Sequence, residues 1–281
     1  MTKPPNALVD SDWLEARLDD PNTRVIALNM TDSVNYDQAH IPGAVFWNWK
    51  DMLWDPDIRN FPTPETFAER CAAAGISNDT DVVFYGDPMV QFGTYAWWVF
   101  TYCGHQNAYV LDGSRVRWEN EGRPMTQEVP QIAPANYAPI QNQNADNMRA
   151  RRDDVLAAIE DADTVILDHR SPEEYQGELL SPPGTPNHGA ERLGHIPGAH
   201  HLHFEDMVTE DTSFKPADEL RAMLEARGAT PDKSIVSYCR LSHRATLAYF
   251  ALTQLLGYEN VRSYDGSWTE WGSLVGVPIE R

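Results

Sequence analysis

The sequence predicts an α/β protein of two tandem domains, each a mostly parallel sheet flanked by helices, related by internal duplication. Apolar, β-branched segments alternate with helical segments along the chain, as they do where helices cover both faces of a parallel sheet. A block of the first half also recurs in the second without a gap, at an offset of 153 residues, from Tyr85/Tyr238 to Trp118/Trp271. A repeat of this length is a whole domain.

The individual elements follow from apolar periodicity, helix caps and turn residues. In the first half we expect a helix Asp12–Leu18 capped by Ser11, a strand Arg24–Leu28, a helix Thr63–Gly75, a strand Asp81–Tyr85, a helix Phe92–Cys103 and a strand Ala108–Leu111. In the second half we expect a strand Val165–Asp168, a helix Ala217–Gly228, a strand Asp232–Tyr238 and a helix Ala245–Leu256 that stops at Gly257.

The domain boundaries follow from the repeat and from one proline-containing stretch. Between the two halves, Pro124, Pro130, Pro134 and Pro139 lie in a segment without clear periodicity, which is typical of a linker. We expect an inactive domain over residues 1–120, a linker over residues 121–147 and a catalytic domain over residues 148–281.

Composition limits the class of protein. The net charge of −20 disfavours nucleic acid and anionic membranes as partners, because both require a basic surface. Three cysteines do not make a disulfide framework, and they predict a reducing, cytoplasmic compartment. The N-terminus lacks the apolar core of a signal peptide, and no apolar run approaches the ~18 residues of a membrane-spanning helix.

Cys239 follows a buried strand directly and precedes a helix. Ligands of open α/β sheets bind at the carboxyl ends of strands, and the unpaired amides of a helix N-terminus favour a thiolate. Arg240 and Arg244 flank this turn and would attract an anion. A buried structural cysteine is the alternative, which we assign to Cys71 and Cys103.

The size of the turn indicates which anion it accepts. A cysteine phosphatase loop needs an arginine at position 245, where this chain has alanine. The loop Cys239–Arg244 is therefore tighter, and it suits a single sulfur atom better than a phosphate. In the repeat, Gly86 replaces the cysteine and Gln91 replaces Arg244, which predicts that the first domain is an inactive copy.

Together these features resemble the rhodanese family of two-domain sulfurtransferases, which act on thiosulfate or 3-mercaptopyruvate. The resemblance rests on His-Ile-Pro-Gly-Ala at 40–44 and 195–199, SPEEY at 171–175, the loop CRLSHR and the ending GYENVRSYDGSWTEWGSLVGVPIE. It implies that each domain is rhodanese-like, that Cys239 is the catalytic cysteine and carries a persulfide, and that the enzyme uses no metal or organic cofactor. The implied substrate-binding residues are Arg240, Leu241, Ser242, His243, Arg244 and Arg170.

The loop residues also bear on the sulfur donor. Arg240 favours thiosulfate, because thiosulfate-preferring members of the family tend to carry arginine there and arginine pairs well with a sulfonate. Ser242 replaces a glycine of many family loops, so it is strained if the backbone there is unusual. Glu174 stands where some thiosulfate enzymes have a second arginine, and we expect Arg244 to supply that charge instead.

Several interpretations stay open at this point. His40 either takes part in the site or stabilises a turn, and the histidines at 195, 200, 201 and 203 fit a polar strand end better than a metal site. The inserted segment 176–194 is either a lid or a surface excursion. The predicted partners are a small anionic sulfur donor and a thiophilic acceptor such as cyanide or a thiol. The alternative functions are a mercaptopyruvate sulfurtransferase and a carrier that delivers persulfide sulfur to an acceptor protein.

Overall fold

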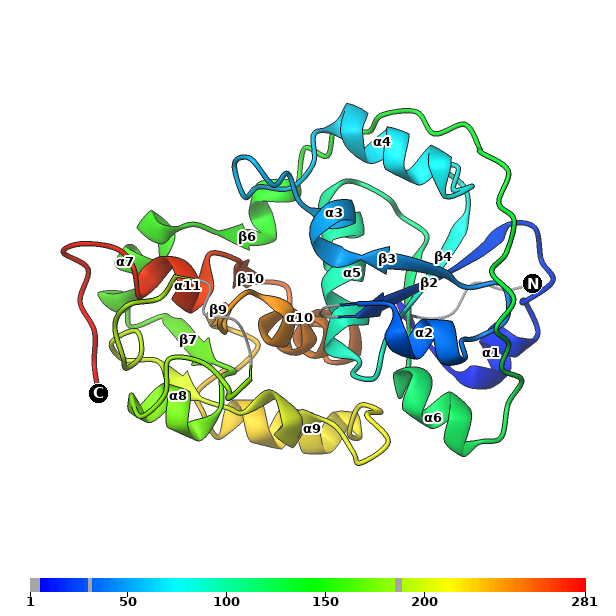
Figure 1. The fold of residues 1–281 in the computed structure, drawn as a ribbon. Coiled ribbons are helices and arrows are strands. Elements are labelled where there is room, and N and C mark those ends of the chain that lie inside the picture. Colours follow the sequence, from blue (N-terminus) through cyan, green and yellow to red (C-terminus); the bar gives the residue numbers. More distant parts are fainter. Residues whose placement is uncertain (1–5, 30–31, 185–188) are drawn as a thin grey trace. The chain divides into compact units, whose positions relative to one another are not determined.

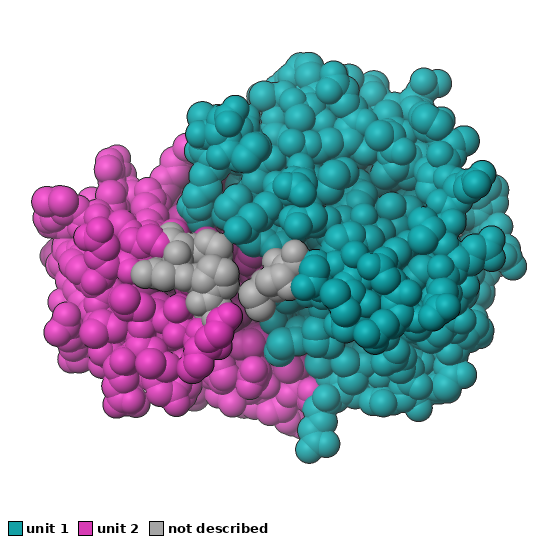
Figure 2. Space-filling view, in the orientation of Figure 1, with its two compact units in different colours: residues 1–145, 210–213 teal, residues 146–209, 214–281 magenta. Residues whose placement is uncertain are grey.

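A computed structural model describes residues 6–29, 32–184 and 189–281 of the chain (Figure 1). The chain divides into two units (Figure 2). Unit 1 comprises Met1–Ala145 and Glu210–Ser213, and unit 2 comprises Asp146–Thr209 and Phe214–Arg281. The segment predicted as a linker belongs to unit 1 as far as Ala145, and the amide of Ala135 bonds the carbonyl of Ala72 there at 2.9 Å.

Each unit contains one five-stranded sheet in which all pairings between the strands are parallel. In unit 1 the order is β1-β5-β4-β2-β3, with bounds β1 Leu8–Val9, β2 Thr23–Asn29, β3 Val45–Asn48, β4 Asp81–Gly86 and β5 Ala108–Leu111. In unit 2 the order is β6-β10-β9-β7-β8, with bounds β6 Arg149–Ala150, β7 Thr164–Asp168, β8 His200–His201, β9 Ser234–Tyr238 and β10 Val261–Tyr264. The two orders are the same topology, which confirms the tandem duplication predicted from the sequence.

The helices connect these strands. Those of unit 1 are α1 Ser11–Glu15, α2 Val34–Gln38, α3 Trp49–Leu53, α4 Pro64–Ala73, α5 Gln91–Tyr102 and α6 Ser114–Asn120. Those of unit 2 are α7 Arg152–Ile159, α8 Pro172–Gln176, α9 Ala217–Glu225, α10 His243–Phe250 and α11 Ser267–Trp271. Short 3₁₀ turns form at Ala145–Asn147 and Phe204–Met207, and a π turn forms at Ala251–Leu255.

Each sheet buries both of its faces, because successive side chains of a strand point to opposite sides. In unit 1, α1, α2 and α6 cover one face, where Tyr85 and Val83 pack with Trp118 (Figure 1). On the other face, Phe84 of β4 meets Phe100 of α5 with ring centroids 4.7 Å apart. Among the described residues, no helix is long and apolar enough to cross a membrane.

All of the predicted helices form, with ends that differ by a few residues from those expected, and two of these differences have a clear cause or consequence. The first begins at Ser11 rather than Asp12 and ends at Glu15, because the side chain of Asp10, not Ser11, accepts the cap bond from the amide of Trp13. The helix predicted from Ala245 begins two residues earlier, at His243, and its winding changes after Phe250 from α to π. The helix expected over Thr63–Gly75 spans Pro64–Ala73, with Thr63 as its N-cap and Pro64 in its first turn as predicted.

The two His-Ile-Pro-Gly-Ala stretches form equivalent turns. In unit 1 the ring of Tyr36 stacks on His40 with centroids 3.8 Å apart, and its hydroxyl donates to the carbonyl of Ala44 at 2.8 Å. The His40 ring is fully buried, and its two nitrogens lie 2.8 and 3.1 Å from the carbonyl oxygens of Tyr36 and Glu128. Of the two roles considered for His40, this geometry favours the stabilisation of a turn.

Unit 2 repeats this arrangement. Tyr175 stacks on His195 at 3.8 Å, and its hydroxyl donates to the carbonyl of Ala199 at 2.8 Å. The pentapeptide therefore marks a structural turn in both units, and it explains why the motif recurs at domain-repeat spacing.

Candidate active site

Cys239 lies directly after β9, at the carboxyl end of the central strand of the unit 2 sheet. Its side chain is buried, with 1% of its surface exposed. The non-helical turn after it is shorter than the six residues predicted, because α10 already begins at His243. The thiol therefore lies at the base of a very short turn that opens a helix, where the first amides lack intrahelical acceptors and carry positive potential.

The start of α11 fixes the first two peptide groups of this turn. The amide of Trp268 donates to the carbonyl of Cys239 at 2.9 Å, and both the amide and the hydroxyl of Thr269 donate to the carbonyl of Arg240. The hydroxyl of Ser267 accepts the amide of Cys239 at 3.2 Å. Because these two carbonyls are held by α11, they are kept away from the sulfur. The sequence alone did not indicate this contact between α11 and the turn.

Ser242 adopts a left-handed backbone conformation, with φ 75° and ψ −23°. This confirms the strain predicted from the absence of glycine, because a Cβ disfavours this region. The hydroxyl of Ser242 lies 3.0 Å from that of Ser263, so a buried hydrogen bond offsets part of the cost.

We expect Ser242→Gly to be more stable than Ser242→Ala by about 1 kcal/mol, because both variants lose the hydroxyl but only alanine keeps a Cβ at a positive φ. Urea unfolding of the two variants measures this difference. Equal stabilities, or a more stable alanine variant, would mean that the turn imposes no strain on residue 242.

Arg244 makes a two-pronged ion pair with Glu174 of α8, with nitrogen–oxygen distances of 2.6 and 3.0 Å. Burial of Glu174 opposes its ionisation, but the hydrogen bonds and charge of Arg244 outweigh that effect and lower the pKa of the carboxyl. Arg244, which we expect to supply positive charge to the site, is thus paired with a fully buried carboxylate, and its contact with a substrate stays a prediction. The same carboxylate also accepts the amide of Ser171 at 3.1 Å, which caps α8.

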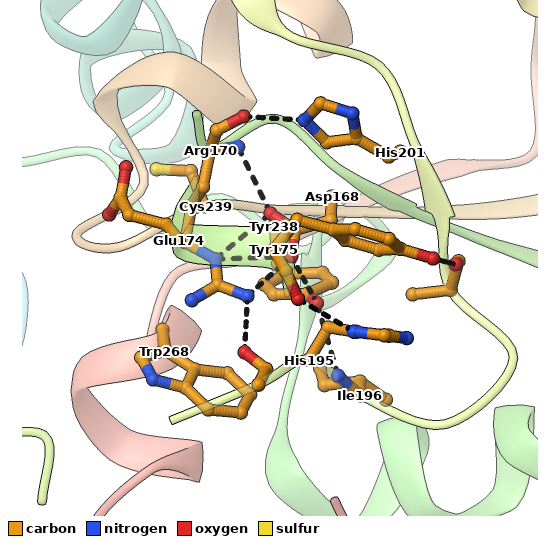
Figure 3. Close-up of polar contacts among 12 residues, drawn as sticks. Asp168, Arg170, Glu174, Tyr175, His195, Ile196, His201, Tyr238, Cys239 and Trp268 are labelled. Carbon is orange, nitrogen blue, oxygen red and sulfur yellow. Dashed lines mark hydrogen bonds and ion pairs between the residues drawn. The ribbon is translucent and has the colours of Figure 1, made fainter. Parts of the chain in front are cut away.

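A second buried ion pair lies under the turn (Figure 3). Arg170 bonds both carboxylate oxygens of Asp168, which also accepts the hydroxyl of Tyr238 at 2.6 Å. The guanidinium carbon of Arg170 lies 4.3 Å from the ring centroid of Trp268. Burial disfavours the charge on Asp168, yet Arg170 holds the pKa of this carboxyl below its usual value. Sequence reasoning missed Asp168, although it is the last residue of a predicted strand.

The predicted substrate-binding residues fall into two groups. Arg240, Ser242 and His243 are buried in or beside the turn, Leu241 is half-buried, and Arg240 and Arg244 both act electrostatically on Cys239. Arg170 is instead fully buried in its pair with Asp168, and its Nη1 atom has no hydrogen-bond partner among the described residues. A substrate contact by Arg170 stays a prediction.

The turn of unit 1 that aligns with Cys239 has no room for a side chain. A Cβ built on Gly86 would lie 1.7 Å from the carbonyl oxygen of Met89. The arginine nearby, Arg115, pairs with the buried carboxylate of Asp87 at 3.2 Å. Gln91, which aligns with Arg244, is buried at the start of α5.

His195, His201 and the described part of the inserted segment make structural contacts. One ring nitrogen of His195 bonds the carbonyl of Tyr175, and one of His201 bonds the carbonyl of Arg170. Residues 185–188 of the insertion lie outside the described residues. The guanidinium of Arg192, which follows them, donates to four carbonyl oxygens at the end of α11 and beyond it, those of Trp271, Gly272, Leu274 and Val277. Because helix ends leave carbonyls unpaired, Arg192 fixes the C-terminal segment.

The fold and the site define a duplicated α/β protein in which one unit carries a cysteine at the end of a parallel strand, followed by two arginines in the next five residues. The Rhodanese-like domain family matches this chain twice, over residues 10–121 and 151–274. The chain belongs to the rhodanese family of sulfurtransferases.

Its relatives extend over nearly the whole chain. It is 46% identical to "Sulfur carrier protein TtuD" of Thermus thermophilus, over 99% of this chain and 97% of the relative. It is 42% identical to a Haloferax volcanii protein named "Putative thiosulfate sulfurtransferase", over 98% of this chain and 96% of the relative. Among solved structures, the anaerobic ergothioneine biosynthesis enzyme from Chlorobium limicola aligns with a TM-score of 0.85 at 23% identity, covering 98% of this chain and 70% of that one, which indicates a shared fold.

Proposed function

We propose that this protein is a thiosulfate sulfurtransferase that transfers the sulfane sulfur of thiosulfate to a thiophilic acceptor through a persulfide on Cys239. The observation that carries the proposal is the position of Cys239, at a strand end, under the first turn of α10 and within electrostatic range of Arg240 and Arg244. A thiolate in such a setting is a nucleophile for sulfur.

The proposed reaction has two balanced steps. The Cys239 thiolate attacks the outer sulfur of thiosulfate, the sulfur–sulfur bond of the donor breaks, and sulfite leaves with the electron pair. Cyanide or a thiolate then attacks the outer sulfur of the persulfide and regenerates the Cys239 thiolate. Amides at the start of α10 would stabilise the persulfide anion, as preorganised donors do for other developing anions.

The substrate-binding residues follow from charge and position. Arg240 would pair with the sulfonate oxygens of thiosulfate, and Leu241 would border the entry, since it is the half-buried member of the turn. Ser242, His243 and Arg244 would shape the pocket around the outer sulfur. Arg170 would contribute its unpartnered Nη1 donor, either to the donor molecule directly or through a bound water.

Two alternatives keep the same nucleophile. A mercaptopyruvate sulfurtransferase would use a carboxylate-bearing donor. A persulfide carrier would deliver its sulfur to an acceptor protein, and the 46% identity to a protein named a sulfur carrier favours this alternative. The three cysteines are free thiols, which suits the proposed reducing, cytoplasmic compartment.

Thiocyanate formation from cyanide tests the proposal when it is run in parallel with thiosulfate and with 3-mercaptopyruvate. Faster turnover of thiosulfate supports it. Preference for mercaptopyruvate would contradict the proposed donor and leave Cys239 in its role. A persulfide mass on Cys239 without turnover of either donor would favour the carrier.

We expect Arg240→Gly to raise the KM for thiosulfate by about 10-fold to 100-fold, the scale of one lost hydrogen bond between charged groups. The KM for mercaptopyruvate should change less, because its charge lies on a carboxylate farther from the reacting sulfur. Steady-state rates with both donors measure the effect. Equal changes for the two donors would remove Arg240 from donor selection.

A further inference from the structure

We propose that Glu174 determines the donor selectivity of this site by cancelling the charge of Arg244. The inference rests on the proposed sulfur-transfer function and assigns to it a residue that lies outside the turn. Glu174 is fully buried, and its carboxylate is bonded to Arg244 through both oxygens at 2.6 and 3.0 Å.

The influence of Glu174 extends beyond its direct partner. Among the charged groups that act on Arg240, Glu174 has the largest effect, and it also acts on Arg170. Both loop arginines in turn act on Cys239. Glu174 therefore acts on all three of these arginines, most directly on Arg244 and less on Arg170, where Asp168 dominates. Burial keeps this effect from being screened by solvent.

The consequence for a donor depends on its charge. Thiosulfate is a dianion at neutral pH, whereas 3-mercaptopyruvate is a monoanion while its thiol is protonated. Because Coulomb energy is proportional to the charge of the donor, the penalty from Glu174 is twice as large for thiosulfate. Glu174 therefore lowers the preference for thiosulfate below the level that the arginines of the turn would give on their own.

The test compares Glu174→Gln with Glu173→Gln. Glutamine keeps the shape and can still accept the amide of Ser171, while it removes the charge. Glu173 is the neighbouring residue of α8 and is exposed, so its variant is a matched control for the loss of one negative charge. The readout is kcat/KM for each donor, which in a two-step transfer reports the donor half-reaction alone.

We expect Glu174→Gln to raise kcat/KM by about 10-fold for thiosulfate and about 3-fold for mercaptopyruvate. The electrostatic penalty from Glu174 is twice as large for thiosulfate, and a doubled energy corresponds to the square of the change in kcat/KM. Glu173→Gln should leave the ratio of kcat/KM for thiosulfate to kcat/KM for mercaptopyruvate unchanged. Glu174→Asp, which keeps the charge, should also leave this ratio unchanged. An equal loss for both donors in Glu174→Gln would overturn the inference, because that is the effect of a merely structural residue.

A second variant keeps the inference testable if Glu174→Gln does not fold. The double variant Glu174→Gln/Arg244→Met removes both charges of the pair. Folded proteins tolerate this better than the loss of one buried charge. The ratio of kcat/KM for thiosulfate to kcat/KM for mercaptopyruvate should then stay within about 2-fold of the wild type. The reason is that the two removed charges are opposite, so their net effect on a donor was already small. A large fall in the thiosulfate preference would mean that Arg244 acts despite Glu174, and would refute the proposal.

These outcomes separate the inference from the function on which it rests. Wild-type protein that forms no persulfide with either donor would overturn both. Wild-type activity with an unchanged ratio in Glu174→Gln would overturn the role of Glu174 alone.

Discussion

We expect Cys239→Ser to abolish thiocyanate formation, with a fall in kcat of about four to six orders of magnitude, the scale for removal of a catalytic nucleophile. A serine hydroxyl is not ionised near neutral pH and cannot form a persulfide. The replacement is nearly isosteric and the native thiol is free and buried, so the unfolding temperature should change little. The measurement is the steady-state rate, together with the intact mass after incubation with thiosulfate.

Cys103→Ser is the matched control for this result. Cys103 is also free and buried, and burial raises the pKa of its thiol to about 12, so it is protonated and unreactive. We expect its variant to keep full activity and to gain the mass of one sulfur atom from thiosulfate. Retained transfer in Cys239→Ser, or lost transfer in Cys103→Ser, would contradict the assignment of the nucleophile.

Arg170→Met should lower the free energy of unfolding by about 3–5 kcal/mol, because it leaves the carboxylate of Asp168 buried without its cation. Methionine fills similar volume, so lost packing contributes little. Urea unfolding measures the change. The effect is specific to burial: Arg262→Met breaks the partly exposed pair with Asp154 and should cost less than about 1 kcal/mol.

Removal of both partners refines this prediction. Combining Arg170→Met with Asp168→Asn should recover most of the lost stability, since the replacement of a complete buried pair is often nearly neutral. If Arg170→Met is no less stable than the control Arg262→Met, solvent reaches Asp168 in the native state.

The duplication, the parallel α/β class of each half and the position of Cys239 at a strand end could all be predicted from the sequence, because repeats and apolar periodicity record them directly. Ser242 was also predictable, since a non-glycine residue in a tight turn suggests backbone strain and the structure gives it a positive φ. These features depend on residues that are close together in the sequence or related by one constant offset.

The pairing of Arg244 with Glu174 could not be predicted in the same way. The two residues are 70 positions apart, and their contact depends on how α8 and α10 pack around the sheet edge. Each side chain alone suggested a role in attracting or repelling an anion, and only the distance between them shows that the charges cancel. The bonds from α11 to the carbonyls of Cys239 and Arg240 were hidden for the same reason.

The carbonyl of Met89 limits which mutations could place a nucleophile in unit 1. Because that oxygen occupies the space a Cβ would need at Gly86, a single nucleotide change that introduces cysteine there cannot recreate a nucleophile. The backbone from Gly86 to Met89 would first have to be rebuilt. Unit 1 can therefore gain a side chain at this strand end only together with a new turn, whereas unit 2 carries Cys239 within its existing turn.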